Sequence, residues 1–267
     1  SKADTNGVFQ CESQLFKGIL RKMQPTKFEH IIALLAIGRP GPLGAGIVDD
    51  YVDCLHGKKE PEYPHEDLKP VLEETYGLII YQEQVMKIAQ VISGYSLGEA
   101  DLLRRAMGKK QPEVMAAEKS RFIEGALRNG YNQELAEHLF ELIEYFSGYG
   151  FNKSHACGYA YLSYITAYLK YYFPSEFYAA IMSAEAEKTS TDSELRAYLQ
   201  DCYQKQIPIL LPDINESEAG FTSINGKIRF GLNSIKGLGE KAIEDIINKQ
   251  PYTDLQDFYN RIDKRVV

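Results

Sequence analysis

Four basic side chains stand close together in the string LRRAMGKK, near the expected end of a helix. They are Arg104, Arg105, Lys109 and Lys110, and no acidic residue separates them. Arginine offers forked hydrogen bonds to phosphate and lysine offers a point charge, so this group can converge on a polyphosphate. The alternative is a structural role, because cations also complement the dipole at a helix C-terminus.

A second polar group lies in the string GYGFNKSH. It comprises Asn152, Lys153, Ser154 and His155 and opens a long expected helix. Asn152 or Ser154 can cap that helix, and its free N-terminal amides attract phosphate. A plain capped loop without a ligand is the alternative. A thiol-protease dyad is excluded, because His155 and Cys157 stand two residues apart and point in different directions on a helix.

Tyrosine and phenylalanine crowd residues 145–178. Within the long helix, Tyr161, Tyr164, Tyr168 and Tyr172 fall on one face. We expect most of these aromatic side chains to pack in a core, and a minority of the tyrosines to offer a stacking platform for bases.

Residues 232–247 have the spacing of a helix-hairpin-helix motif, in which a glycine turn presents backbone amides to phosphate without reading base sequence. The candidate DNA-binding residues are Lys236, Gly237, Leu238, Gly239 and Lys241. The same glycines with Ala242 also satisfy G-x-G-x-x-A. A dinucleotide site is nevertheless excluded, because the remaining residues cannot supply the βαβ unit that it needs.

The other chemically active side chains do not form a recognisable centre. Asp49, Asp50 and Asp53 cluster on an expected helix, and we interpret them as a solvated face rather than a two-metal site. The four cysteines are scattered along the chain, which indicates free thiols in a reducing cytoplasm. We therefore predict no catalytic residue, no metal ligand and no cofactor in this chain.

Capping signals predict a mainly α fold over the first 205 residues. Three sequences match the capping box, namely Thr26–Glu29, Ser96–Glu99 and Thr191–Glu194. The helices are expected at residues 14–23, 27–37, 46–56, 82–93, 97–107, 112–128, 133–147, 155–173, 175–186 and 192–205. The string RPGPLGAG at residues 39–46 is expected to be a rigid turn.

The pattern changes after Gln206. Two apolar stretches, 221–224 and 227–232, flank Asn225 and Gly226, which is a strong hairpin signal. Helices are expected at 240–249 and 254–262. We therefore predict a helical domain at 1–206, followed by a β-hairpin and helix-hairpin-helix module at 207–267.

The 267 residues carry a formal charge of −7, which taken alone argues against a nucleic-acid partner. Residues 183–220 supply most of this charge, with eight acidic side chains against three basic ones. Local potential steers an anionic ligand more than the total charge does, so nucleotide and DNA remain possible ligands. The apolar runs are too short for a membrane span. The polar N-terminus is no secretory signal, and we expect a segment of a longer, cytoplasmic protein.

Five strings together carry a resemblance to a known family. They are GVFQ at 7–10, RPGP at 39–42, YQEQVM at 81–86, LRRAMGKK at 103–110 and GYGFNKSH at 148–155. With them the chain resembles the fingers region of the C-family replicative DNA polymerases, the family of the bacterial DNA polymerase III alpha subunit. Cys11 departs from the aliphatic or aromatic residue expected after FQ, with an effect on packing only.

The resemblance implies part of a DNA-directed DNA polymerase, a nucleotidyltransferase whose Mg²⁺ is held by palm aspartates outside this chain. The fragment alone is then expected not to polymerise. The expected partners are the incoming deoxynucleoside triphosphate (dNTP), template-primer DNA and other replisome subunits, with no membrane.

The resemblance also assigns roles to residues. Arg104 and Arg105 match the fingers arginines near the triphosphate, and further strings match the lining or walls of the nucleotide pocket: Lys109, Lys110, Asn152, Lys153, Ser154, His155, Arg39, Tyr81 and Gln82. In the family, tandem helix-hairpin-helix motifs follow, and only the first is expected here in full.

Two functions of other classes remain open. The first is a non-catalytic DNA-binding module that uses the glycine hairpin. The second is a helical scaffold that contacts replisome proteins through the acidic stretch, including Glu185, Glu187 and Glu194.

Overall fold

The computed structural model describes residues 2–109, 112–147, 150–186 and 194–265. The chain divides into two compact units. Unit 1 comprises Ser1–Asp4 and Ser13–Leu162, and unit 2 comprises Thr5–Glu12 and Ser163–Val267. The predicted mainly α fold with a small β module is confirmed, and the predicted domain boundary at residue 206 stays a prediction.

Among the described residues of unit 1, every regular element is a helix. Its elements are α1 (Gln14–Met23), α2 (Phe28–Ile37), α3 (Pro40–Gly44), α4 (Ile47–Leu55), the 3₁₀ helix η1 (Glu66–Leu68), α5 (Lys69–Leu72), the 3₁₀ helix η2 (Glu73–Thr75), α6 (Gln82–Ser93), α7 (Leu97–Lys109), α8 (Pro112–Arg128), α9 (Gln133–Ser147) and the first part of α10 (Lys153–Tyr172).

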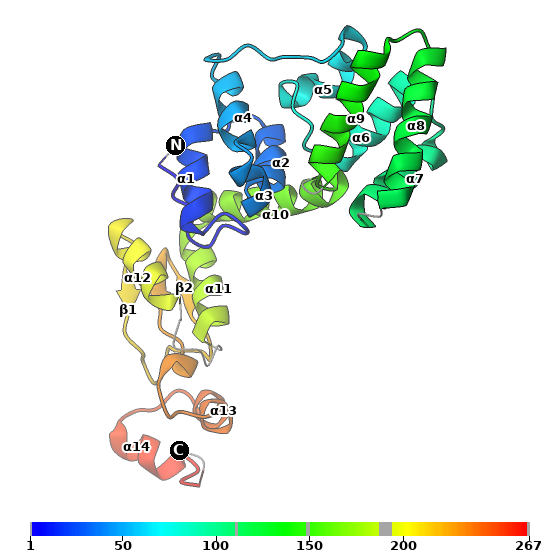
Figure 1. Ribbon diagram of the computed structural model, residues 1–267. Coiled ribbons are helices and arrows are strands. Elements are labelled where there is room, and N and C mark those ends of the chain that lie inside the picture. The colour runs from blue at the N-terminus through cyan, green and yellow to red at the C-terminus, as the bar shows by residue number, and fades with distance from the viewer. Residues whose placement is uncertain (1, 110–111, 148–149, 187–193, 266–267) are drawn as a thin grey trace. The chain divides into compact units, whose positions relative to one another are not determined.

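Helices α6, α7, α8 and α9 pack against one another and form the group at the upper right of Figure 1. Helices α6 and α8 approach closely at Gly125, where a Cβ atom would lie 2.4 Å from the carbonyl oxygen of Ser93. The Ser93 hydroxyl donates a hydrogen bond of 2.7 Å to the carbonyl oxygen of Phe122, which fixes the same crossing. Only glycine permits this approach, so Gly125 sets the position of α8 against α6.

Of the two predicted capping boxes that lie within the described residues, one forms and the other does not. The Ser96 amide donates to the Glu99 carboxylate at 2.8 Å, and the Glu99 amide donates to the Ser96 hydroxyl at 3.3 Å, which confirms that capping box. The box at Thr26 is wrong, because Lys27 is the N-cap of α2 and no side chain caps that helix. Thr191 lies outside the described residues.

Two further local predictions in unit 1 are corrected. Residues 39–46 were expected to form a rigid turn, but Pro40–Gly44 forms the short helix α3, whose first position is a proline. Proline is well suited to that position, because the amide that it lacks has no intrahelical partner there. The short helices between Glu66 and Thr75 were not predicted at all.

Unit 2 combines helices with a three-stranded sheet. Its elements are the second part of α10, α11 (Pro174–Ala186), α12 (Leu195–Gln204), β1 (Ile209–Leu210), β2 (Thr222–Ile224), β3 (Lys227–Arg229), the 3₁₀ helix η3 (Leu232–Ser234), α13 (Glu240–Asn248) and α14 (Leu255–Arg261).

The hairpin predicted at Asn225 and Gly226 is confirmed, since β2 and β3 pair antiparallel and both turn residues have positive φ. β1 adds to the other edge of β3 in parallel, giving the order β1-β3-β2. The sheet shares its core with α11 and α12 through Tyr178, Cys202 and Ile228, each with 0% exposure.

A buried polar network ties the N-terminal segment Thr5–Glu12 into unit 2. The Lys170 ammonium, on a side chain with 6% exposure, donates to the Asn6 carbonyl oxygen at 2.8 Å and lies 3.3 Å from the Asp201 carboxylate. The Asn6 carboxamide nitrogen and the Tyr178 hydroxyl donate to the same carboxylate, both at 2.8 Å. The buried charges are thus paired and hydrogen-bonded, as burial requires.

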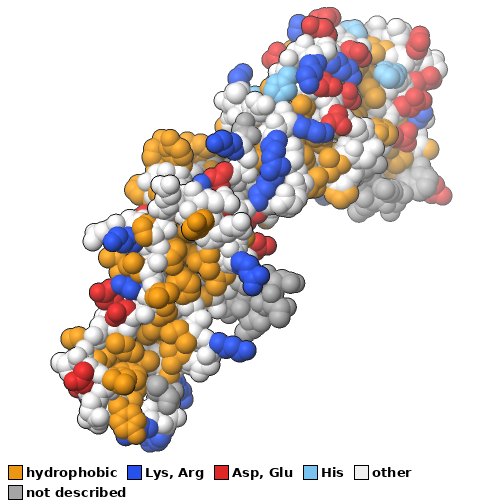
Figure 2. Space-filling model, turned by 90° about the vertical axis from the view of Figure 1, so that its left-hand side faces the viewer, with side chains coloured by type: hydrophobic (Ala, Val, Ile, Leu, Met, Phe, Trp, Pro, Cys, Tyr) orange, Lys and Arg blue, Asp and Glu red, His pale blue; other side chains and the backbone are white. Residues whose placement is uncertain are grey.

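The space-filling view shows how side chains are distributed on one face. Over the upper part of Figure 2, basic and acidic side chains are interspersed rather than gathered into a field of one sign. Asp49, Asp50 and Asp53 follow this rule, because they pair with Lys22, Lys59 and Lys58 respectively. The interpretation of these carboxylates as a solvated helix face is therefore confirmed.

The exposure of the aromatic side chains contradicts the prediction that most of them pack in a core. On α10, Tyr161, Tyr164, Tyr168 and Tyr172 are 60%, 51%, 45% and 59% exposed. Tyr168 and Tyr172 lie with ring centroids 4.5 Å apart. The shared face predicted from their spacing is correct, but the face points to solvent rather than to a core.

Candidate nucleotide site and helix-hairpin-helix turn

Two predicted strings that are far apart in sequence meet through their backbones in unit 1. The Phe151 amide donates to the Ile80 carbonyl oxygen at 3.0 Å, and the Gln82 amide donates to the Phe151 carbonyl oxygen at 2.9 Å. This parallel bridge centres on Tyr81 and Phe151. It brings the N-termini of α6 and α10 to one place, which we call the helix-start site.

Arg104 joins the helix-start site from α7. Its Nη1 atom lies 3.4 Å from Oε1 of Gln82, and Nε2 of Gln82 lies 3.3 Å from the Gly150 carbonyl oxygen. The Arg104 side chain is 30% exposed, so it is accessible to a ligand while its position is fixed. The structure thus brings together three of the predicted strings around one glutamine side chain.

Arg105 lies beside Arg104 but is more exposed. Both guanidinium groups pair with the Asp101 carboxylate, at 2.7 Å for Arg104 and 2.8 Å for Arg105. The hydrogen bond from Arg104, which is the larger cause, and that from Arg105 hold the pKa of the Asp101 carboxyl below its usual value. The Arg105 side chain is 63% exposed. Of the two predicted lysines nearby, the side chain of Lys109 and the whole of Lys110 lie outside the described residues.

The N-terminus of α10 is capped by Asn152. The Asn152 carboxamide oxygen accepts the His155 amide at 2.7 Å, so Asn152 rather than Ser154 supplies the cap. Ser154 is exposed. His155 is also exposed. Its ring centroid lies 4.1 Å from that of Tyr159 and 5.6 Å from that of Phe151.

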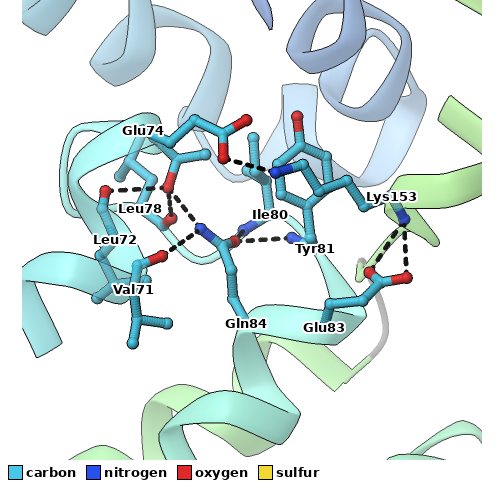
Figure 3. Close-up of polar contacts among 10 residues, drawn as sticks. Val71, Leu72, Glu74, Leu78, Ile80, Tyr81, Glu83, Gln84 and Lys153 are labelled. Atoms are coloured by element: carbon cyan, nitrogen blue, oxygen red, sulfur yellow. Dashed lines mark hydrogen bonds and ion pairs between the residues drawn. The ribbon is translucent and has the colours of Figure 1, made fainter. Parts of the chain in front are cut away.

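Lys153 lies between two carboxylates in Figure 3. Its backbone amide donates to both oxygens of Glu83, at 3.0 and 3.1 Å, and its ammonium donates to Glu74 at 2.6 Å. The Asn152 carboxamide nitrogen also donates to Glu83, at 2.9 Å. The helix N-terminus that the sequence suggests as a phosphate site therefore already holds an anionic group of the protein.

Tyr81 and Arg39 are packed side chains rather than exposed contacts. Tyr81 is 1% exposed, and its hydroxyl is buried without a hydrogen-bond partner. Burial, followed by the charge of Glu74, raises its pKa. Arg39 is half-buried, donates to the Ala36 carbonyl oxygen at 2.8 Å and stacks 4.4 Å from the Phe151 ring centroid. Burial lowers the pKa of Arg39.

The sequence did not identify Gln84, the residue that holds this backbone in place. Its Oε1 atom accepts the amides of Ile80 and Tyr81, both at 2.9 Å, as Figure 3 shows. Its Nε2 atom donates to the Thr75 hydroxyl at 2.7 Å. The acidic partners Glu74, Glu83 and Asp101 were also missed. The only sequence signal was that Gln84 and Glu83 belong to the string YQEQVM.

Unit 2 carries the predicted helix-hairpin-helix turn. Gly237 has φ +93°, a conformation that favours glycine, and Gly239 is the N-cap of α13 without a side-chain cap. Lys236 and Lys241 are exposed on either side of the turn. Leu238 instead packs against the hydrophobic cluster of Leu232, Ile243 and Ile246 and anchors the turn.

Glu185 does not fit the alternative scaffold hypothesis, in which the acidic stretch is a surface for other proteins. This side chain is 5% exposed and accepts the Glu194 amide at 2.9 Å, so it is not part of an acidic surface. Glu187 lies outside the described residues. All four cysteines are free thiols.

Within the described residues, no group of three or more His, Cys, Asp or Glu side chains is placed to hold a metal ion. Among the same residues, no helix is both long and apolar enough to cross a membrane.

Two family models match this chain. Residues 1–130 match the family model of the bacterial DNA polymerase III alpha subunit finger domain, and residues 206–267 match that of a helix-hairpin-helix motif.

The chain is 49% identical to the DNA polymerase III alpha subunit of Escherichia coli strain K12 over 274 residues, covering 99% of this chain and 23% of the relative. The corresponding subunit of Pseudomonas aeruginosa is 47% identical over 276 residues, covering 99% and 23%. That of Helicobacter pylori is 44% identical over 272 residues, covering 97% and 22%. The chain thus spans less than a quarter of the length of these relatives.

Proposed function

Since the chain belongs to the family of bacterial DNA polymerase III alpha subunits and carries their finger region and a helix-hairpin-helix motif, we propose that its helix-start site binds the triphosphate of an incoming dNTP. In this proposal the chain is part of a DNA-directed DNA polymerase. It contributes nucleotide binding and positioning rather than the chemical step.

One observation carries the proposal, namely the chain of contacts that runs from Arg104 through Gln82 to Gly150. It places an arginine of α7 beside the N-terminus of α6 and the loop that opens α10. A triphosphate carries several anionic oxygens on tetrahedral phosphorus atoms, and a fixed guanidinium can donate two hydrogen bonds to them. The backbone amide of Lys153 at the start of α10 adds a further donor, which Glu83 occupies in this structure.

The described residues act on the ligand by holding it. Arg104 neutralises charge on the triphosphate, and Lys153 supplies a second cation from the first turn of α10. Phe151 with Arg39, together with the buried ring of Tyr81, forms a rigid wall behind them. Fixing the nucleotide in one orientation reduces the entropy that the reaction would otherwise lose.

No catalytic residue is assigned to this chain. The resemblance places the metal-binding aspartates of the polymerase outside it, and a Mg²⁺ ion held there would supply charge stabilisation to the transferred phosphoryl group. The chain alone is therefore proposed not to polymerise.

The test is steady-state kinetics of an alpha subunit that contains this segment. Arg104→Ala removes a charge-assisted hydrogen bond, and we expect the KM for dNTP to rise about tenfold. Arg128→Ala is the matched control, because Arg128 is exposed at the end of α8. An unchanged KM and kcat in Arg104→Ala would refute the role of this residue.

A second binding function is supported by the turn of unit 2. Gly237 has positive φ, and Gly239 starts α13 without a side-chain cap, so the first amides of the helix are available to a phosphate group. We propose that this turn binds the backbone of duplex DNA without reading its sequence.

Duplex binding by the chain, measured at a series of salt concentrations, tests this second proposal. Lys236→Ala and Lys241→Ala should each reduce the slope of log K against log salt by about 0.9, because each lysine neutralises one phosphate. Lys227→Ala, at an exposed lysine of β3, should leave the slope unchanged. Equal slopes for all variants and the wild type would contradict the proposal.

A further inference from the structure

The phosphate-binding groups of the helix-start site are all paired with carboxylates of the same unit. Asp101 holds Arg104 and Arg105, and Glu74 holds the ammonium of Lys153. Glu83 accepts two hydrogen bonds from the backbone amide of Lys153.

The geometry at Glu83 resembles that of a bound anion. Its two oxygens accept the Lys153 amide at 3.0 and 3.1 Å, and one of them also accepts the Asn152 carboxamide at 2.9 Å. Backbone amides at a helix start are the donors that a phosphate group uses. A ligand phosphate and the Glu83 carboxylate would therefore compete for the same donors.

Asp101 stands in the same relation to the arginines. Each of its two oxygens accepts from a different guanidinium group, Oδ1 from Arg104 and Oδ2 from Arg105. The fork of Arg104 that would bind a phosphate is thus occupied at Nη2 and Nε by Asp101.

We propose that Asp101 and Glu83 are placeholder anions, which occupy the triphosphate-binding groups of the free protein and are displaced when the triphosphate binds. Glu74 has the same role toward the ammonium of Lys153. This inference rests on the proposed nucleotide-binding function. It assigns to the three carboxylates a role in setting nucleotide affinity.

The physical consequence is an exchange of one anion for another. Before the ligand arrives, the carboxylates orient the cations and neutralise their charge. Displacing the carboxylates costs free energy, which subtracts from the binding free energy of the ligand. Because each pair is partly exposed, removal of one carboxylate charge should strengthen triphosphate binding about two- to fivefold. A carboxylate that only orients its partner has the opposite effect, since its removal would weaken binding.

The test is calorimetric titration of the chain with inorganic tripolyphosphate, which contains the proposed charge pattern without base or sugar. Asp101→Asn and Glu83→Gln keep the shape of the side chain and remove its charge. Both variants should bind tripolyphosphate about two- to fivefold more tightly than the wild type. Their gains should multiply in the double variant, because the two carboxylates pair with different donors.

Asp49→Asn is the matched control. Asp49 pairs with Lys22 at 2.9 Å, and its loss changes the net charge of the protein by the same amount. This control should leave the affinity for tripolyphosphate unchanged. An equal gain in Asp49→Asn would show that net charge alone accounts for the effect and would overturn the inference.

Arg104→Ala separates the two proposals. If wild-type chain binds tripolyphosphate and Arg104→Ala weakens it, the nucleotide site stands. Unchanged or weaker binding in both Asp101→Asn and Glu83→Gln then overturns the placeholder role alone. If the wild-type chain binds no tripolyphosphate, the proposed function and the inference fail together.

Discussion

Gln84 holds the backbone on which the helix-start site is built. One oxygen of this buried side chain accepts two backbone amides, those of Ile80 and Tyr81, and its nitrogen donates to Thr75. A buried donor left without a partner costs about 1–3 kcal/mol, so a single side chain here affects two such donors at once.

Gln84→Met should therefore lower the free energy of unfolding by about 2–5 kcal/mol, because it leaves both amides unpaired in a site of nearly the same volume. Urea denaturation followed by circular dichroism measures this change. Gln90→Met, at a half-buried glutamine of the same helix, should change stability by less than about 1 kcal/mol. Equal stabilities of the two variants would contradict the role of Gln84.

We expect the thiols to differ in reactivity, for reasons that are also local. Burial, and then the charge of Asp201, raises the pKa of Cys202 to about 12. The thiol therefore stays protonated at pH 8 and becomes a reactive thiolate only when the pH approaches that value. Cys157 is only half-buried.

Iodoacetamide at pH 8, with peptide mapping by mass spectrometry, should accordingly modify Cys157 first. Cys202 should react only after the protein is unfolded in denaturant. Equal rates for the two cysteines in the folded protein would show that Cys202 is not buried as described.

At the scale of elements, the structure confirms the signals that depend on neighbouring residues. The Ser96–Glu99 box and the Asn225–Gly226 turn both form as their sequences predict. The box at Thr26 fails because His30 competes locally, with its Nδ1 atom accepting the Thr26 amide at 3.2 Å.

Features that depend on distant residues could not be predicted in this way. The parallel pairing of β1 with β3 joins segments that no short turn connects. The same holds for the site, where the strings were recognised but the partners of their cations were not. Lys153 and Glu74, for example, meet only because η2 and the start of α10 are folded together.

The start of α10 offers a direct test at this scale. Asn152→Ala removes the cap of a long helix and should lower the free energy of unfolding by about 1 kcal/mol. Ser154→Ala, two residues further along, should have almost no effect, since Ser154 is exposed and Asn152 supplies the cap. Thermal or urea unfolding that ranks the variants in the reverse order would identify Ser154 as the cap.

At the scale of the whole molecule, a net charge of −7 coexists with two proposed sites for anionic ligands. The cations at the helix-start site are offset by carboxylates around them, so charge counted over the chain does not report the potential that a ligand meets. What decides binding is whether a ligand can replace those carboxylates at fixed donors.

The central claim is that the helix-start site binds a nucleoside triphosphate, and equilibrium binding of a fluorescent dNTP to the 267-residue chain, followed by anisotropy, tests it most directly. We expect saturable binding to the wild type, about tenfold weaker binding to Arg104→Ala, and wild-type affinity in Arg128→Ala. Equal affinities for the wild type and Arg104→Ala, or the absence of saturable binding, would contradict the claim.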